Sequence, residues 1–223
     1  MGIRRLSAVE LLIALALLFF CAPFVEEMKG GDIIVSILLS LVLISAVLAV
    51  SNRRRTFVVA VLLAIPAVVG RWINHFRPHL LPPAIFLLAG LVLLAFVGAH
   101  LLCFVLRAPS VNLEVLCASV SAYLILGLIW TIAYWLVAAI NPAAFAFNTT
   151  TGGKESMQGF NAFYFSFITL STVGYGDITP VSKVARMLAA MEAMTGLFYV
   201  AVLIARLVSL YSAPGSTGHP EEK

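Results

Sequence analysis

The segment Thr172–Asp177 has the residue types and spacing most suited to binding chemistry, and it reads Thr-Val-Gly-Tyr-Gly-Asp. Two glycines within three residues disfavour a helix and permit positive φ angles. The preceding run, Phe160–Ser171, is aromatic and about three helical turns long, which is too short to cross a bilayer core of about 30 Å. Non-helical backbone at membrane depth is tolerated only inside protein or against a water-filled cavity. A short apolar helix followed by Gly-x-Gly therefore predicts a re-entrant loop that lines a pore.

Such a loop needs a membrane around it, and the composition indicates one. Of the 223 residues, 62% are hydrophobic and 11% are charged, whereas soluble domains are nearer half apolar and a quarter charged. The net charge of +4 comes with basic residues at the ends of apolar runs, which indicates membrane topology rather than a nucleic-acid surface. Three scattered cysteines provide neither a disulfide framework nor a zinc site.

Six apolar stretches predict an all-α membrane protein with six transmembrane helices and a re-entrant pore helix with its loop. Arginines at 4–5, 53–55 and 107 fall on one side of alternating spans, and that side should be the cytoplasm, with both termini inside. The predicted spans are Val9–Val25, Ile33–Val50, Thr56–Gly70 with a kink at Pro66, Ala84–Leu106, a segment after Pro109 that reaches Ile140, and Ser182–Leu210.

This layout divides the chain into three parts. Residues 1–107 should form a four-helix membrane domain, and residues 108–212 a pore domain made of an outer helix, the pore helix, the loop and an inner helix. Residues 213–223 are polar and contain Pro and Gly, so we expect a disordered cytoplasmic tail.

The placement of TVGYG and Asp after a short helix and between two spans resembles the selectivity filter of bacterial six-span potassium channels with one pore loop per subunit. The resemblance is tight over Phe160–Pro180 and looser over the last two spans, roughly half of the chain. It implies a homotetramer that conducts K⁺ passively across a bacterial inner membrane, with K⁺ as permeant ion and no other cofactor.

The chemistry of such a filter is the replacement of water by backbone oxygens. Carbonyls of Thr172, Val173, Gly174 and Tyr175, with the Thr172 hydroxyl at the inner end, can provide stacked rings for K⁺. Consecutive carbonyls can point the same way only if alternate residues take unusual dihedrals, which Gly174 and Gly176 permit. One chain provides one side of each ring, so four chains around an axis are implied.

Side chains around the filter should hold its diameter. By resemblance, Tyr175 points outward into a cuff formed by Tyr164 and Phe165, and Tyr164 hydrogen-bonds Asp177 at the outer mouth. The Thr169 hydroxyl on the pore helix completes the expected support.

The last span carries the candidate gating residues. Glu192 is a carboxylate deep in an apolar span; either it is protonated and hydrogen-bonded behind the filter to hydroxyls such as that of Thr169, or it faces the cavity and attracts cations. Gly196 is either a hinge, as in the resembling family, or a site of close helix packing. An apolar stripe either lines the inner cavity, where it could gate by dewetting, or packs against the fifth span or lipid; its residues are Leu197, Val200, Ala201, Ile204 and Val208.

Several other functions are disfavoured or left open. The fourth span, Ala84–Leu106, has no Lys or Arg, so we expect little intrinsic voltage dependence. The sequence shows no nucleophile–base pair or metal cluster, so an enzyme is not expected. A weakly selective cation channel remains an alternative, although Tyr175 and both filter glycines argue against it. A non-conducting regulatory subunit is a further alternative.

The expected partners are copies of the chain and membrane lipid. Asn148-Thr149-Thr150 also matches a glycosylation acceptor.

Overall fold

The computed structural model describes residues 7–26, 28, 30–50, 54–76, 82–148 and 156–212, and over these residues the chain is mostly helical. The predicted tail, residues 213–223, lies outside the described residues apart from the end of the last helix at Ser212. The helices and strands are α1 Ser7–Glu26, α2 Gly31–Ala49, α3 Arg54–Phe76, α4 Pro83–Arg107, α5 Leu113–Ile140, the 3₁₀ turn η1 Pro142–Ala144, β1 Phe145–Phe147, α6 Gly159–Leu170, β2 Ile178–Pro180 and α7 Lys183–Ser212.

Five of these helices, α1, α3, α4, α5 and α7, are long and apolar enough to cross a membrane. The apolar part of α2, Ile33–Ala49, is shorter, so a sixth span stays a prediction. The third helix continues to Phe76, beyond the predicted end at Gly70, and Pro66 lies inside it. Gly70 allows this helix to pack closely on α4, because a Cβ there would lie 2.6 Å from the Cβ of Phe86.

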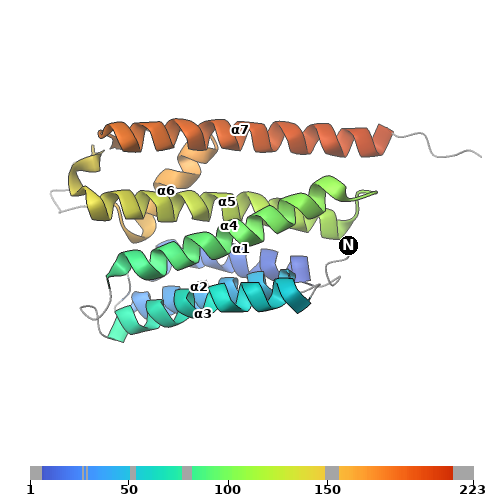
Figure 1. The fold of residues 1–223 in the computed structure, drawn as a ribbon. Coiled ribbons are helices and arrows are strands. Elements are labelled where there is room, and N and C mark those ends of the chain that lie inside the picture. The colour runs from blue at the N-terminus through green and yellow to red at the C-terminus, as the bar shows by residue number, and fades with distance from the viewer. Residues whose placement is uncertain are drawn as a thin grey trace, which may run out of the picture.

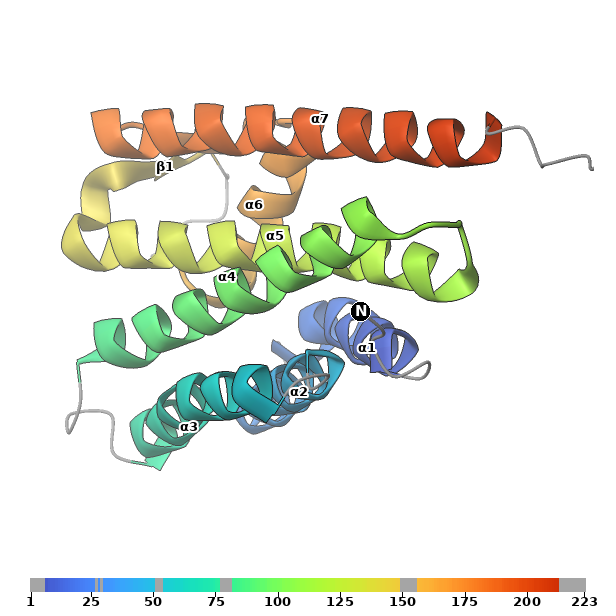
Figure 2. The same ribbon diagram turned by 45° about the vertical axis from the view of Figure 1, so that its right-hand side comes forward.

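The helices are arranged in two groups. Figure 1 shows α7 running alongside α5, with α1, α2 and α3 on the opposite side of α5 and α4. Figure 2, a turned view, shows the short helix α6 between α5 and α7. The start of α1 and the end of α7 lie at the same end of the molecule, which agrees with an even number of crossings (Figure 1).

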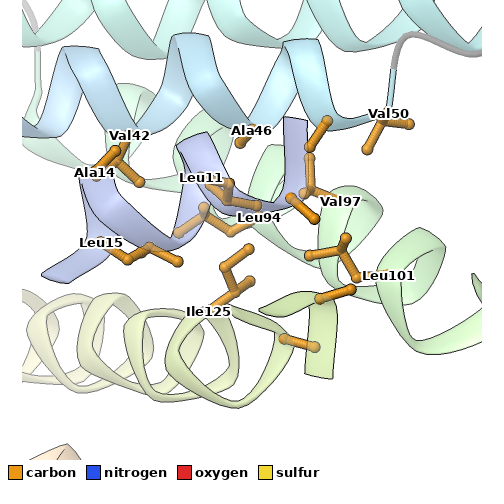
Figure 3. Close-up of a cluster of buried hydrophobic side chains, with 14 of the residues drawn as sticks. Leu11, Ala14, Leu15, Val42, Ala46, Val50, Leu94, Val97, Leu101 and Ile125 are labelled. Atoms are coloured by element: carbon orange, nitrogen blue, oxygen red, sulfur yellow. The ribbon is translucent and has the colours of Figure 1, made fainter. Parts of the chain in front are cut away.

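Two clusters of buried apolar side chains hold the groups together. The larger cluster joins α1, α2, α4 and α5 (Figure 3) and includes Leu11, Leu15, Val42, Leu94 and Ile125. The smaller cluster lies where α5, β1 and α6 meet, and Tyr134, Phe145 and Phe165 contribute its aromatic rings. The first cluster attaches α1 to α5, and the second fixes α6.

The connection between α6 and α7 is anchored by a two-stranded antiparallel sheet that the sequence analysis did not predict. Strand β1, before α6, pairs with β2, after the Gly-x-Gly loop, with Phe147 opposite Ile178. The ladder continues where the Val181 backbone N–H donates to the carbonyl of Ala144. Ser182 then caps the N-terminus of α7, since its hydroxyl accepts from the Ala185 N–H at 3.1 Å.

Candidate functional site

The loop between α6 and β2 has an alternating backbone. Positive φ angles occur at Thr172 (60°), Gly174 (52°) and Gly176 (82°), that is, at every second residue. The unusual dihedrals predicted at the two glycines are therefore confirmed. Thr172 takes a positive φ as well, although a β-branched residue in this region typically costs about 1–3 kcal/mol.

Backbone amides of the loop are tied to the end of α6. The Thr172 N–H donates to the carbonyl of Thr169 at 2.9 Å, and the N–H groups of Val173 and Gly174 donate to the carbonyl of Ile168 at 2.9 and 3.2 Å. These bonds use the free carbonyls at the helix C-terminus and fix the inner half of the loop to the pore helix.

The carbonyl oxygens of residues 172–175 differ from these backbone amides in their hydrogen bonding. Among the described residues, none of these four oxygens accepts a hydrogen bond. Val173 is 52% and Tyr175 is 73% exposed in the single subunit, and a Cβ at Gly174 or Gly176 would have no atom within 4 Å. The loop thus offers four consecutive backbone oxygens on a segment that one subunit leaves uncovered.

The outer end of the loop is held by the connection that precedes α6. The Asn148 N–H donates to the Asp177 carbonyl at 2.7 Å, and the Asn148 side-chain amide donates to the Gly176 carbonyl at 3.0 Å. The side chains of Tyr164 and Asp177 interact at the outer mouth, but Asp177 Oδ1 has no hydrogen-bond partner among the described residues, so the expected hydrogen bond stays a prediction. The role of Asn148 was not predicted from the sequence, because its side-chain partner Gly176 is 28 residues away.

Phe165 is buried within its own subunit, and its expected place in a cuff around Tyr175 stays a prediction. It is 3% exposed, and its ring packs edge-on against Tyr134 and Phe145 at 4.9 and 5.6 Å between centroids. Successive helical residues point about 100° apart, so Tyr164 and Phe165 cannot both face the filter in the same subunit. Tyr164 faces Asp177, and Phe165 anchors α6 to α5 and β1.

Glu192 lies at the centre of three helices. It is fully buried even in the single subunit. Its Oε2 accepts from the Tyr134 hydroxyl on α5 at 2.5 Å, and its Oε1 lies 2.6 Å from the Ser166 hydroxyl on α6. The expected position behind the filter fits this geometry, and the cavity-facing alternative does not. The expected partner Thr169 is wrong: Thr169 lies three residues further along α6, and Ser166 is the residue that faces α7.

Two glycines allow α6 to lie this close to its neighbours. A Cβ at Gly196 on α7 would lie 2.1 Å from the carbonyl oxygen of Leu170, the last residue of α6. A Cβ at Gly127 on α5 would lie 2.2 Å from the ring of Phe167. Gly196 therefore serves close packing, the second of its two interpretations, and its use as a hinge stays a prediction.

The apolar stripe on α7 faces away from the packed side of its subunit. Leu197, Val200, Ile204 and Val208 are 43–59% exposed, and Ala201 is exposed as well. The other side of the helix holds Glu192, Gly196 and Tyr199, whose hydroxyl donates to the carbonyl of Ser119 on α5. The stripe is thus available for a cavity or another subunit, and its cavity-lining role stays a prediction.

Helix α1 contacts the back of the pore helix, which the sequence did not indicate. The ring of Phe19 packs edge-on against Phe163 and Phe167 at 4.6 and 4.5 Å between centroids. Phe167 is also the ring that fills the space beside Gly127. Helix α1 therefore contacts α6 of its own subunit directly, and Phe19 is one of the side chains that make this contact.

Comparison with known proteins places the site within a matched region. An ion channel family model matches residues 118–213, from α5 to the end of α7. The chain is 40% identical over 63 residues to Two-pore potassium channel 4 of Arabidopsis thaliana, covering 28% of this chain and 22% of that protein. It is 40% identical over 70 residues to Voltage-gated potassium channel Kch of Escherichia coli, covering 28% and 17%.

A third relative is covered over most of its length. Protein LctB of Bacillus caldotenax is 32% identical over 98 residues, which is 44% of this chain and 72% of that protein. By contrast, the chain spans less than a quarter of the length of the two named potassium channels. What all these proteins share with the chain is a segment of 63 to 98 residues.

Proposed function

Because this chain belongs to the ion channel family, we propose that it is one subunit of a homotetrameric, potassium-selective pore. The observation that carries this proposal is the alternation of left-handed residues at Thr172, Gly174 and Gly176, beside carbonyls at 172–175 without hydrogen-bond partners among the described residues. The names of its relatives support K⁺ as the permeant ion, since two of them are potassium channels.

Conduction would follow from oxygen exchange. A K⁺ ion entering the filter gives up water and gains carbonyl oxygens of Thr172, Val173, Gly174 and Tyr175, with the Thr172 hydroxyl at the inner end. Rings from four subunits are needed to surround the ion. The exposure of Val173 and Tyr175 in one subunit is consistent with three further copies completing the site.

The pore helix would contribute its dipole as well as its backbone. The carboxyl end of α6 carries a partial negative charge, which would favour a cation in the cavity on the inner side of the filter. Part of this end is already committed, because the carbonyls of Ile168 and Thr169 accept from the filter amides. These hydrogen bonds would therefore hold α6 and the filter in a fixed position relative to each other.

Glu192 would keep α6 in place as a neutral acid. The Ser166 hydroxyl has one proton but contacts two oxygens, Glu192 Oε1 at 2.6 Å and the Gly127 carbonyl at 2.8 Å. A carbonyl cannot donate, so both contacts are satisfied if Ser166 donates to Gly127 and protonated Glu192 donates to Ser166. A neutral acid also avoids a buried unpaired charge.

The surrounding helices bear on the location of the protein and on voltage gating. The exposed apolar side chains of α1, α3 and α7 fit contact with lipid or other subunits. We place the protein in a bacterial inner membrane with both termini in the cytoplasm. Helix α4 carries its only Arg or Lys at its end, Arg107, so several gating charges are not expected.

Ion flux into liposomes tests the proposal. Purified protein should carry barium-sensitive K⁺ flux and little Na⁺ flux under matched gradients. Equal flux of both ions would favour the weakly selective cation channel instead. Absence of flux under all ionic and pH conditions, in a protein that still forms tetramers, would favour the non-conducting subunit.

A further inference from the structure

The outermost peptide of the filter is held by one residue from outside the filter. Asn148 follows β1, whose last residue Phe147 pairs with Ile178 in β2. It therefore lies opposite Asp177, the residue through which the chain leaves the filter. From there its backbone N–H reaches the Asp177 carbonyl and its side-chain amide reaches the Gly176 carbonyl, at 2.7 and 3.0 Å.

The bond to Asn148 affects the orientation of the Gly176 carbonyl. Its φ of 82° lies in the left-handed region, and a Cβ there would have no atom within 4 Å, so local packing does not fix it. Peptides next to glycine reorient easily because no side chain restricts them. Among the described residues, the Asn148 amide is the hydrogen-bond donor that determines where this carbonyl points.

The contrast with the neighbouring carbonyls suggests a division of roles. Oxygens of residues 172–175 have no hydrogen-bond donor within the described part of the subunit, whereas the oxygen of Gly176 has one. An oxygen that accepts from Asn148 is turned toward the loop and is less available to an ion. The Tyr175 carbonyls then form the last complete ring.

We propose that Asn148 is a positioning residue that fixes the Gly176 peptide and so defines the outer end of the ion path. This inference rests on the proposed channel function, and it adds a residue outside the filter that keeps the filter ordered. Asn148 acts through Gly176 and does not touch the ion. Without its amide, the outer peptide would populate a second orientation in which the Tyr175 ring is distorted.

Ion binding and the Asn148 bond then stabilise the same ordered state. A ligand that binds one conformation shifts the population toward it. Loss of the Asn148 amide should therefore be most visible at low K⁺ concentration and should be relieved at high K⁺. A residue that only helped the chain to fold would not show this dependence.

The first test compares Asn148→Ala with the wild type in liposomes over a range of external K⁺. One lost hydrogen bond corresponds to about a fivefold shift in an equilibrium, so the K⁺ concentration for half-maximal flux should rise at least about fivefold. Flux at saturating K⁺ and the preference over Na⁺ should stay within about twofold. An unchanged K⁺ dependence would overturn the proposal.

Asn141→Ala is the matched control from the same connection. The Asn141 side chain accepts from the Ala143 N–H at 3.2 Å and caps η1 without touching the filter. This variant also loses an asparagine hydrogen bond, and its K⁺ dependence should be that of the wild type. An equal shift in both variants would assign the effect to the connection as a whole and overturn a specific role for Asn148.

A second variant tests the donor itself. Asn148→Asp keeps the shape and the backbone bond to Asp177, but its carboxylate faces the Gly176 carbonyl without a proton. Flux at low K⁺ should fall below that of Asn148→Ala at neutral pH and recover as the pH falls toward about 4, where the acid can donate again. Among the described residues, Asp177 contacts Asn148 directly, and Tyr164 and Tyr175 interact with Asp177 or with each other, so the wild type is measured over the same pH range. Absence of recovery would overturn the donor role.

Failure of the channel assignment can be told apart from failure of this inference. If the wild type carries no K⁺ flux, the proposed function fails, and Asn148 is then tested by calorimetric titration of the purified protein with K⁺. Equal affinity in the wild type and in Asn148→Ala would overturn the positioning role. Weaker binding in the variant alone would support it.

Discussion

The pore region, α5 to α7, and the preceding helices, α1 to α4, are held together by different kinds of contact. In the pore region, single positions admit few residue types: glycine at 127 and 196, where any side chain would overlap a neighbour, and a hydrogen-bonding polar side chain at 192. Between α1, α2 and α4 the contacts are mainly aliphatic, and close packing of the glycine type is found between α3 and α4, at Gly70 beside Phe86. Hydrogen bonds also join α2 and α3, among them those from Arg71 to Ser36 and from Trp72 to Ser40.

This difference explains why one region is more easily recognised than the other. Aliphatic packing tolerates exchanges that conserve volume, at less than about 1.5 kcal/mol each, so many sequences satisfy it. Close backbone approach and directed hydrogen bonds tolerate few exchanges. The ion channel family model accordingly begins at residue 118, inside α5.

The largest difference between the two regions is expected for a substitution in the proposed filter. Gly174→Asp places a charged side chain on a residue with φ of 52°, where a Cβ is disfavoured, and beside the expected ion path. We expect loss of more than about 99% of K⁺ flux, because the strained backbone and the new carboxylate both disturb the carbonyl ring. Liposome flux measures this, with cross-linking to show that the tetramer remains.

Gly30→Asp is the matched control in the other region. Gly30 also has a positive φ, of 91°, and open space around its Cβ position. The strain should be similar, but K⁺ flux should stay within about twofold of the wild type. Normal selective flux through Gly174→Asp, or equal loss in both variants, would contradict the assignment of the filter.

Local features of the chain could be predicted from the sequence, whereas most contacts between distant segments could not. The loop at 172–177 was predictable because Gly-x-Gly after a short helix restricts the backbone to few conformations. Apolar runs gave the helices to within a few residues, except at α3, where the turn of Arg71 and Trp72 is more polar but stays helical through bonds to α2. Other contacts between distant segments were not predictable: Asn148 with Gly176, Tyr134 with Glu192, and Phe19 with α6. A hydroxyl partner for Glu192 on α6 was predicted, but not that this partner is Ser166.

The buried acid gives the next largest expected effect. Glu192→Ala would leave the hydroxyls of Tyr134 and Ser166 without their buried partner, at about 1–3 kcal/mol each in the free energy of unfolding. Glu192→Gln keeps an acceptor for Tyr134 and a donor for Ser166, so stability and flux should stay close to wild type. Denaturant unfolding in detergent and liposome flux measure the two properties.

A carboxylate in the other region provides the comparison for this variant. Glu10 on α1 is exposed, and Glu10→Ala should change the free energy of unfolding by less than about 0.5 kcal/mol. If Glu192→Gln were as damaging as Glu192→Ala, a charged carboxylate would be required and the neutral-acid assignment would be wrong.

Close packing is tested by adding one methyl group to each region. Gly196→Ala would bring a Cβ to 2.1 Å from the Leu170 carbonyl oxygen, so α7 must shift away from α6. We expect a loss of about 3 kcal/mol in the free energy of unfolding, near the upper end for overpacking, and a reduced K⁺ flux. Gly90→Ala on α4 meets only Ile132, at an ordinary 3.7 Å, and should be neutral or stabilising by up to about 1 kcal/mol. Equal effects of the two changes would show that α7 and α6 separate freely and would favour the hinge role of Gly196.

The smallest expected effect lies at the contact between the two regions. Phe19→Ala removes the edge-on contacts with Phe163 and Phe167, which contribute about 0.5–1.5 kcal/mol each. Its neighbour Phe20 is 76% exposed, so Phe20→Ala serves as the control and should have little effect on unfolding.

If α1 only attaches its region to α5, Phe19→Ala should lower stability by about 1–2 kcal/mol and leave flux unchanged. If α1 also supports the pore helix, flux at low K⁺ should fall along with stability, since the back of α6 loses the ring that keeps Phe167 beside Gly127. The second outcome is the one we expect, because Phe19 contacts α6 directly, and it would make the first four helices part of the filter's support.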